Sequence, residues 1–287
     1  MSINEWQVAS QSHCGNVRKI NEDSVLALTQ PTLLAVADGM GGHQAGDVAS
    51  QMLIEELSVV PLNANLIENI ARVNDAILAS NESIINYSTN HLDGQTVGTT
   101  VVVMLSDKNT ASCLWAGDSR LYRLRKNQLE QLTHDHSHVA ELIQSGLLQP
   151  EDAYNHPSSN IITRSVGVEK QLSLDQIRFD VLSQDTFLLC SDGLYSEVAE
   201  GEMVQAMQAY DIYRGSNWLL NLCLGRAAKD NISFIIARAL DQKSDLQGST
   251  LTFYPDNAKP DCTKPDNTKP DTSEPDSPES DSSNTSN

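Results

Sequence analysis

A chain of 287 residues with 39% hydrophobic side chains is long enough to build one large core or two small ones. Its formal net charge of −19 at pH 7 argues against nucleic acid or an anionic membrane surface as the main partner. The sequence shows neither a signal peptide nor an apolar run approaching the ~18 residues of a membrane span, so we expect a cytoplasmic protein without membrane insertion.

Apolar periodicity divides the first hundred residues into strands followed by helices. Alternating and β-branched runs predict strands over 6–13, 24–29 and 33–37. Apolar side chains that recur near a 3.6-residue period then predict core-facing helices over roughly 45–58 and 65–87. No chemistry is expected of these helices.

The third predicted strand leads into Asp38-Gly39 and a run of further glycines. We expect the Asp38 carboxylate in a turn at the strand end, where glycine lets the backbone approach a bound ion or phosphate. An Asp-Gly pair between a strand and a helix is usually only a turn. The pattern recurs downstream, however, where an apolar strand over 186–191 leads into Asp192-Gly193. Carboxylates at two strand ends can converge on one point, which favours a site.

From Gly98 onward the pattern turns to short β-rich runs joined by polar turns. Strands expected at 99–105, 110–116, 120–125 and 128–133 predict an antiparallel meander. Asp118 lies in one of these turns, where formation of an Asx turn is its simplest role.

The stretch His134-Asp135-His136-Ser137-His138 resembles a metal cluster. A zinc site is not expected there, because no thiol accompanies the histidines and the five cysteines of the chain are widely spaced. The residues that follow, 139–143, instead predict the start of a helix capped by Asp or Ser.

The last part of the chain is predicted to alternate again. An irregular excursion over 146–160 precedes β-rich segments at 161–168 and 176–180, and helices are expected at 200–210 and 218–228 before a last strand at 232–237. After about Asp241 the composition shifts to Pro, Asp, Ser and Thr with a repeated Lys-Pro-Asp unit. We therefore expect one domain over 1–240 and a disordered acidic tail over 241–287.

Helices that flank β-rich halves predict an α+β fold, a four-layer α-β-β-α sandwich of two antiparallel sheets around a dinuclear metal site. Its carboxylates, Asp38, Asp192 and Asp230, are hard oxygen ligands that suit Mg²⁺ or Mn²⁺. Two such ions can share a carboxylate, acidify a water and hold both oxygens of an in-line displacement. Arg18 can grip phosphate oxygens in bidentate fashion, although a surface ion pair with Glu22 or Asp23 is its simpler role.

A series of motifs, in order along roughly residues 6–238, resembles the metal-dependent protein phosphatase family, type 2C, in its compact bacterial form. The motifs are Gly15-Asn16-Val17-Arg18 with Asn21-Glu22-Asp23-Ser24, Ala37-Asp38-Gly39-Met40-Gly41-Gly42, Gly98-Thr99-Thr100, Ala116-Gly117-Asp118-Ser119-Arg120, Leu132-Thr133-His134-Asp135-His136-Ser137, Ile162-Thr163-Arg164-Ser165-Val166-Gly167, Cys190-Ser191-Asp192-Gly193-Leu194 and Asp230-Asn231-Ile232. The acidic tail lies outside the resemblance.

The resemblance implies a serine/threonine protein phosphatase that uses Mg²⁺ or Mn²⁺ and reverses the action of a kinase, by attack of a water that bridges two metal ions. Asp38 would bridge both metals and the Gly39 carbonyl would ligate the second. Asp192 and Asp230 would complete the first. Asp118, together with Asp192, matches the ligands of a weaker third metal.

Further roles follow from the same resemblance. Glu22 matches an acid that reaches the second metal through water, and Asp23 a neighbour that supports the cluster. Arg18 matches the phosphate-binding arginine, which makes it both a catalytic and a substrate-binding candidate, and Asn231 would orient Asp230. The excursion over 146–160 matches a variable flap beside the active site.

One position departs from the family pattern. Several eukaryotic relatives carry a histidine directly after the Asp-Gly pair as the proposed general acid, whereas here that residue is Met40, which cannot donate a proton. His43 is an alternative donor, but its place at a helix entry favours a structural role. Protonation of the leaving group by metal-bound water is the preferred hypothesis.

Two alternative functions remain open. The first is a catalytically inactive, phosphatase-like binding module, which the presence of Asp38, Asp192 and Asp230 argues against. The second is a regulator that releases a partner protein after dephosphorylating it, a class that normally brings an extra sensor domain. We expect a monomer that acts on a phosphorylated protein, opposes a cognate serine/threonine kinase and binds no nucleic acid; the sequence does not identify the substrate.

Overall fold

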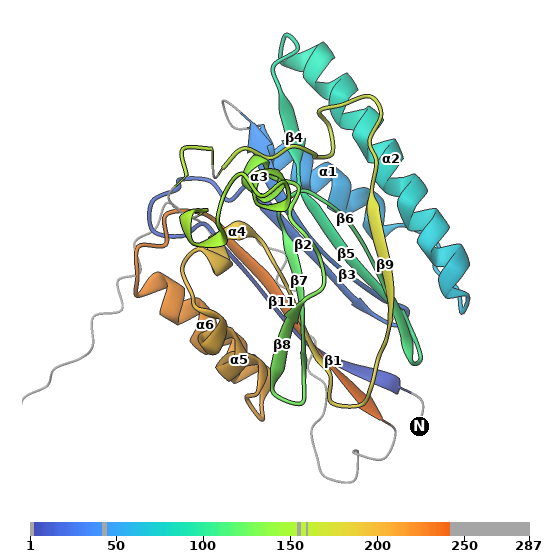
Figure 1. Cartoon of the computed structure of the whole chain (residues 1–287). Helices are drawn as coiled ribbons and strands as arrows, with labels where there is room; N and C mark the ends of the chain where they lie inside the picture. The colour runs from blue at the N-terminus through green and yellow to red at the C-terminus, as the bar shows by residue number, and fades with distance from the viewer. Residues whose placement is uncertain (1–2, 42–44, 154–155, 159, 242–287) are drawn as a thin grey trace, which may run out of the picture.

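The computed structural model describes residues 3–41, 45–153, 156–158 and 160–241; of the predicted tail, Asp241 ends the strand Ile232–Asp241 and residues 242–287 lie outside the described residues, as does His43. Two antiparallel sheets pack face to face, with helices on the outer face of each (Figure 1). The predicted four-layer α-β-β-α sandwich is confirmed.

The first sheet, counted over the described residues, has six strands in the order β2-β3-β5-β6-β9, with β4 paired to β3 off this path. Neighbouring strands pair antiparallel throughout. The strands are β2 (Asp23–Thr29), β3 (Thr32–Gly41), β4 (Val97–Thr99), β5 (Val101–Asp107), β6 (Thr110–Ala116) and β9 (Asp175–Asp180).

The second sheet pairs a strand from the beginning of the described chain with one from its end. Within the described chain it has five strands in the order β1-β11-β10-β7-β8, all antiparallel. The strands are β1 (Ile3–His13), β7 (Arg120–Arg125), β8 (Gln128–Gln131), β10 (Thr186–Cys190) and β11 (Ile232–Asp241).

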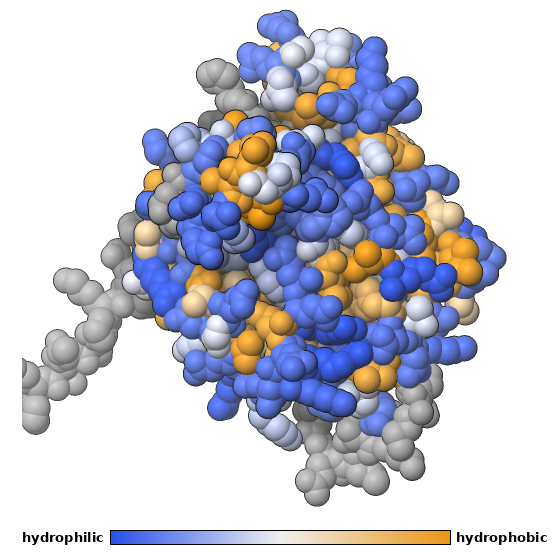
Figure 2. Space-filling model, viewed as in Figure 1, coloured by the Kyte–Doolittle hydropathy of each residue, from blue (hydrophilic) through white to orange (hydrophobic). Residues whose placement is uncertain are grey.

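Helices α1 (Gly46–Ser58) and α2 (Leu66–His91) cover the first sheet, and α5 (Glu200–Met207) and α6 (Ile212–Leu224) cover the second (Figure 1). Shorter elements are α3 (His138–Gln144), η1 (Pro150–Asp152) and α4 (Asp192–Tyr195). None of the helices in the described part of the chain is long and apolar enough to cross a bilayer. On the face drawn in Figure 2, hydrophobic residues form small groups separated by hydrophilic ones.

Each interface between layers has its own hydrophobic cluster, which explains the unbroken apolar runs of the central strands. In β5, Val101 and Val103 pack in the cluster under α1 and α2, whereas Val102 belongs to the cluster between the sheets. A third cluster, with Leu188 and Phe234, lies under α5 and α6. A strand that is covered on both faces needs apolar side chains at every position, so it shows no alternation.

The structure corrects the expected end of the third strand. β3 continues past Ala37 to Gly41, so Asp38 lies inside a strand and not in a turn after it. The ladder continues because Gly39 and its neighbours pair with Val97–Thr99 of β4. The predicted turn at the glycine run is therefore wrong at Asp38.

The expected four-stranded meander is also wrong. β5 and β6 pair in the first sheet, whereas β7 and β8 belong to the second, and the chain crosses between the sheets at 117–119. Alternation along a strand reports which face is buried but not which strand is its neighbour. As a result, Asp118 lies in the crossover between the sheets.

Other boundaries also differ from the prediction. The segment 161–168 forms isolated bridges, Ser137 with Ile162 and Thr99 with Val166, and no strand of its own. Helix α6 begins at Ile212, six residues before the expected start, because the Asp211 side chain accepts a hydrogen bond from the backbone N–H of Tyr213 and caps the helix. The predicted Ser cap of α3 is confirmed, since Ser137 accepts from the N–H of Ala140.

Replacing Phe187 with alanine tests the cluster between the sheets. The Phe187 ring is fully buried and lies 5.8 Å from the Trp6 ring centroid, so we expect the free energy of unfolding to fall by about 3–5 kcal/mol. Urea denaturation measures the change. The control Tyr210→Ala removes a ring that is 98% exposed, and its cost should stay within about 0.5 kcal/mol; equal losses in the two variants would contradict the assigned packing.

Candidate metal and phosphate site

Asp38 lies where β3 changes partners. Asp38 pairs with Asp23 of β2, and the next residue, Gly39, pairs with Thr99 of β4. The Asp38 carbonyl accepts hydrogen bonds from the Thr100 N–H (2.8 Å) and the Thr99 hydroxyl (3.0 Å). The Asp38 N–H donates to the Thr100 hydroxyl oxygen over 3.1 Å. The backbone of this acid is thus fixed from both sides.

Gly39 lets three segments meet beside this acid. Its N–H donates to the carbonyl of Glu22 over 3.1 Å, and a Cβ at this position would collide with the carbonyl oxygens of Glu22 and Gly46. A Cβ on Gly46 would in turn lie 2.6 Å from the Glu22 Oε1 atom. Only glycine therefore allows the entry to β2, the middle of β3 and the start of α1 to approach so closely.

The second sheet contributes Asp192 and Asp230. Asp192 follows the end of β10 and Asp230 precedes the start of β11. Because β10 and β11 are antiparallel neighbours, these two positions lie at the same edge of the sheet. The segments that carry Asp192 and Asp230 are in close contact, since a Cβ on Gly193 would collide with the carbonyl oxygen of Asn231. The structure thus brings the predicted acids together.

Asn231 ties this edge to the connector that carries Arg18 and Glu22. Its side-chain oxygen accepts from the Glu22 N–H (2.8 Å), and its amide donates to the carbonyls of Cys14 (3.1 Å) and Ile20 (3.0 Å). Its backbone N–H donates to Oδ1 of Asp230 over 2.9 Å. Asn231 thus contacts Asp230 through its backbone N–H and the connector through its side chain.

The cluster of acids raises the pKa values of its members. Burial and then repulsion from Asp23 and Asp192 raise the pKa of Asp38. Burial followed by repulsion from Asp230 raises the pKa of Asp192, and burial with repulsion from Asp192 raises the pKa of Asp118 to about 7. The Arg18 guanidinium pairs with Asp230 over 2.6 Å, and its side chain is half exposed. One arginine thus faces several carboxylates.

Asp23 shows that the acids fit a cation. It is buried, its Oδ2 accepts from the Ser191 hydroxyl over 2.9 Å, and its Oδ1 has no hydrogen-bond partner among the described residues. Burial raises the pKa of Asp23 to about 7. Buried carboxylates that repel one another and offer only oxygen donors match what Mg²⁺ and Mn²⁺ prefer, so the residues present fit such ions.

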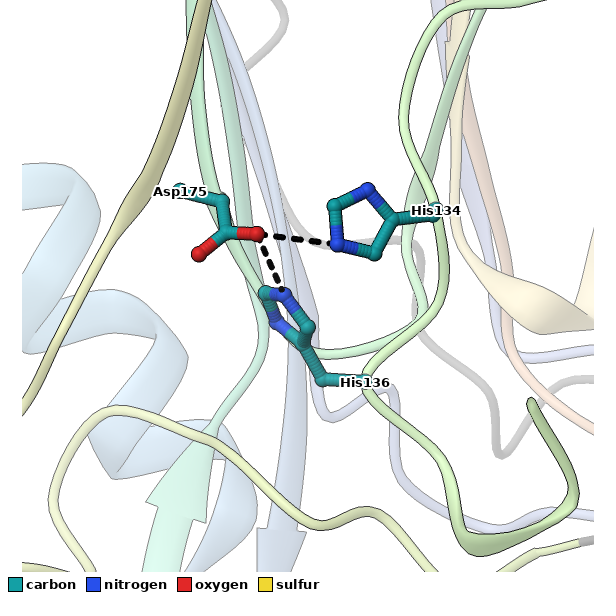
Figure 3. Close-up of side chains that lie close together, drawn as sticks. All are labelled: His134, His136 and Asp175. Atoms are coloured by element: carbon teal, nitrogen blue, oxygen red, sulfur yellow. Dashed lines mark ion pairs between the residues drawn. The ribbon is translucent and has the colours of Figure 1, made fainter. Parts of the chain in front are cut away.

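The structure adds Asp175, which the sequence did not reveal, to two histidines of the stretch His134–His138. Nε2 of His134 and Nε2 of His136 lie 2.9 Å and 3.3 Å from Oδ2 of Asp175 (Figure 3). The ligand atoms of these three residues lie within 4.8 Å of one another. Asp175 lies 39 positions after His136 in the sequence, and the pairing of Trp115 with Asp175 between β6 and β9 brings it here.

Comparisons with known proteins agree with this geometry. The model of the family described as protein phosphatase 2C matches residues 12–214. The serine/threonine phosphatase Stp of Listeria monocytogenes is 36% identical over 241 residues, which are 80% of this chain and 94% of Stp. The serine/threonine protein phosphatase PstP of Mycobacterium tuberculosis is 35% identical over 236 residues, 81% of this chain but 45% of PstP. The chain therefore spans less than half the length of that relative.

Solved structures share the fold. PppA, described as a key regulatory component of T6SS in Pseudomonas aeruginosa, superposes with a TM-score of 0.78 at 40% identity, covering 84% of this chain and 100% of PppA. The catalytic domain of PstP in complex with two manganese ions superposes with a TM-score of 0.75 at 32% identity, covering 83% of this chain and 99% of that domain.

Replacing Asn231 with alanine should loosen this edge of the sheet. The change leaves the Glu22 N–H and two carbonyls without their partner. We expect a loss of about 3 kcal/mol in the free energy of unfolding, since one buried unsatisfied group costs roughly 1–3 kcal/mol. Chemical denaturation measures it. Asn217→Ala, which removes one exposed hydrogen bond to Gln11, is the control; if both variants were equally stable, the assigned role of Asn231 would be wrong.

Proposed function

The chain belongs to the protein phosphatase 2C family of metal-dependent serine/threonine phosphatases, and on that premise we propose that it hydrolyses phosphoserine and phosphothreonine in proteins. The observation that carries the proposal is the convergence of Asp38 from the first sheet with Asp192 and Asp230 from the second. An inactive binding module would not need this complete set of buried, mutually repelling acids.

The same acids would hold the cations. By the family resemblance, Asp38, the Gly39 carbonyl, Asp192 and Asp230 would hold two ions, with Asp38 serving both; the catalytic domain of PstP is described as binding two manganese ions. Glu22 would act through water, and Asp118 would serve a third, weaker site. Such ions lower the pKa of a bound water and offset the negative charge of phosphate.

The chain's own residues orient the substrate. Arg18 lies on the connector that Asn231 fixes, and its planar guanidinium can hold two phosphate oxygens once phosphate competes with Asp230. Asp23, whose carboxylate accepts a hydrogen bond from the Ser191 hydroxyl, would support the neighbouring acids of the cluster. Met40, in β3, has no proton to give the leaving group, and His43 lies outside the described residues.

The partners follow from the chemistry. A phosphorylated protein is the substrate class, and we propose that a cognate serine/threonine kinase supplies it in the cytoplasm. The net charge of −19 disfavours nucleic acid as a competing partner. We propose that the enzyme acts as a monomer whose catalytic domain covers residues 1–240, with either Mg²⁺ or Mn²⁺.

Metal dependence tests the proposal directly. We expect the full chain to hydrolyse p-nitrophenyl phosphate and a phosphothreonine peptide with Mn²⁺ or Mg²⁺ and to stop in EDTA. Asp192→Asn should lower kcat at least ~100-fold, the scale on which losing one electrostatic group acts in catalysis. Glu56→Gln on the exposed face of α1 is the control and should behave as wild type. Absence of turnover with every metal would instead favour the binding module.

Arg18→Ala tests the phosphate contact. Losing a charge-assisted hydrogen bond, worth roughly 1.5–3 kcal/mol, should reduce kcat/KM for the phosphopeptide about 10- to 100-fold, mainly through KM. Arg18→Lys should recover part of the loss, because lysine keeps the charge but not the two-pronged geometry. Steady-state kinetics separates the constants, with Arg214→Ala, at an 89% exposed side chain, as the control. An unchanged KM in Arg18→Ala would remove Arg18 from the phosphate site.

A further inference from the structure

His136 bonds the residue that precedes Asp118 in its turn, while the Tyr195 hydroxyl donates to the Asp118 carbonyl over 3.2 Å and the Ser119 hydroxyl lies 2.7 Å from that of Thr100. The Gly117 N–H donates to Nδ1 of His136 over 3.1 Å, and the Gly117 carbonyl accepts from the backbone N–H of His136 over 2.9 Å. Both backbone groups of the residue before Asp118 are thus bonded to one residue of the loop after β8.

The turn needs this support because of its conformation and its charge. Gly117 has a φ of +110°, and a Cβ there would lie 2.6 Å from Cβ of Thr100, the residue that bonds Asp38. Asp118 is 8% exposed and is repelled by Asp192. A small displacement of the turn would therefore move Asp118 out of the acidic cluster or press on the support of Asp38.

His136 is itself fixed on its far side. Its ring is 5% exposed and stacks on Trp115 with an interplanar angle of 7°. Because Nδ1 accepts the Gly117 N–H, the neutral ring must carry its proton on Nε2, which faces Oδ2 of Asp175 at 3.3 Å (Figure 3). Asp175 is anchored in turn by Arg164, whose Nη1 lies 2.5 Å from Oδ1. A chain of contacts runs from Arg164 to Asp118.

A cation held by His134, His136 and Asp175 is the competing interpretation of these three side chains. Ligation through Nε2 of His136 would require the proton on Nδ1, which would break the hydrogen bond from Gly117. The Arg164 guanidinium also lies 3.2 Å from Nε2 of His136 and would repel the ion. The geometry favours a hydrogen-bonded relay over a second metal site.

We propose that His136, oriented by Asp175, is a positioning residue that holds the Gly117–Asp118 turn in place and thereby sets the affinity of the acidic site for the divalent cation that Asp118 binds. The inference rests on the proposed function, which gives Asp118 that role. His136 touches neither the cation nor the substrate, so it acts through the backbone of Gly117.

The experiment measures Mn²⁺ binding to the full chain without substrate, by electron paramagnetic resonance of free Mn²⁺. In His136→Ala, the Mn²⁺ concentration that half-saturates the weakest site should rise about tenfold, as expected when a buried hydrogen bond is lost. His136→Asn, whose side-chain oxygen can replace Nδ1 as acceptor, should stay within about threefold of wild type. Thermal unfolding of each variant is measured beside its Mn²⁺ titration, to show whether the variant is folded.

Three further variants separate positioning from general loosening. In the Asp118→Asn background, His136→Ala should cause no further change in Mn²⁺ binding, because the residue through which it acts is gone. Asp175→Asn leaves the His136 ring and its stacking on Trp115 in place, so it provides the test if His136→Ala does not fold. It should raise the Mn²⁺ concentration that half-saturates the weakest site about threefold. His134→Ala is the matched control, since His134 contacts Asp175 but its side chain is 68% exposed, and it should bind Mn²⁺ as wild type does.

Three results would overturn the proposal. The first is wild-type Mn²⁺ binding in both His136→Ala and Asp175→Asn. The second is an equal loss of Mn²⁺ affinity on His136→Ala in the wild-type and Asp118→Asn backgrounds. The third is the disappearance of one bound ion in His134→Ala, which would make the cluster of His134, His136 and Asp175 a metal site. Because binding is read without substrate, a wild-type protein that binds Mn²⁺ but hydrolyses no phosphoester would overturn the proposed function and leave this test standing.

Discussion

Mutual repulsion among buried carboxylates is the constraint on which the rest of this structure depends. Asp23, Asp38, Asp118 and Asp192 all have raised pKa values, with burial the largest cause in each case. Left alone, such groups would move apart or take up protons. Their positions persist because the backbone around each acid is tied to another segment, so the fold supplies rigidity where the side chains supply only repulsion.

The contacts that hold the backbone differ from acid to acid. Asp38 is held by two threonine hydroxyls and a strand that changes partners, and Asp230 by the backbone N–H of Asn231. The turn of Asp118 is held in part by His136, in the loop after β8, and by the Tyr195 hydroxyl. The close approaches at Gly39 and Gly193 serve the same end, since each lets one backbone segment lie directly against another. The flanking helices contribute packing but no functional group to this arrangement.

The sequence predicted the parts of the site that are encoded locally. An apolar strand followed by Asp-Gly identified Asp38 and Asp192, and the layer order followed from the distribution of helices and β-rich runs. The sheet to which β7 belongs was not predictable, because alternation does not specify a neighbour. Asp175 was missed for a related reason: its contact with His136 depends on the register of β9 against β6, which no local pattern records.

The hydrogen bonds of Asn231 have a consequence for how the protein is made. They join residues more than 200 positions apart, and β1 pairs with β11, which are the first and the last strand of the described residues. During synthesis the nascent chain has no partner for β1 and no second set of acids until β11 has left the ribosome. Contacts of such long sequence separation form late and slowly. We therefore expect the edge that carries the acids to close last, so that a chain still lacking β11 would lack the activity.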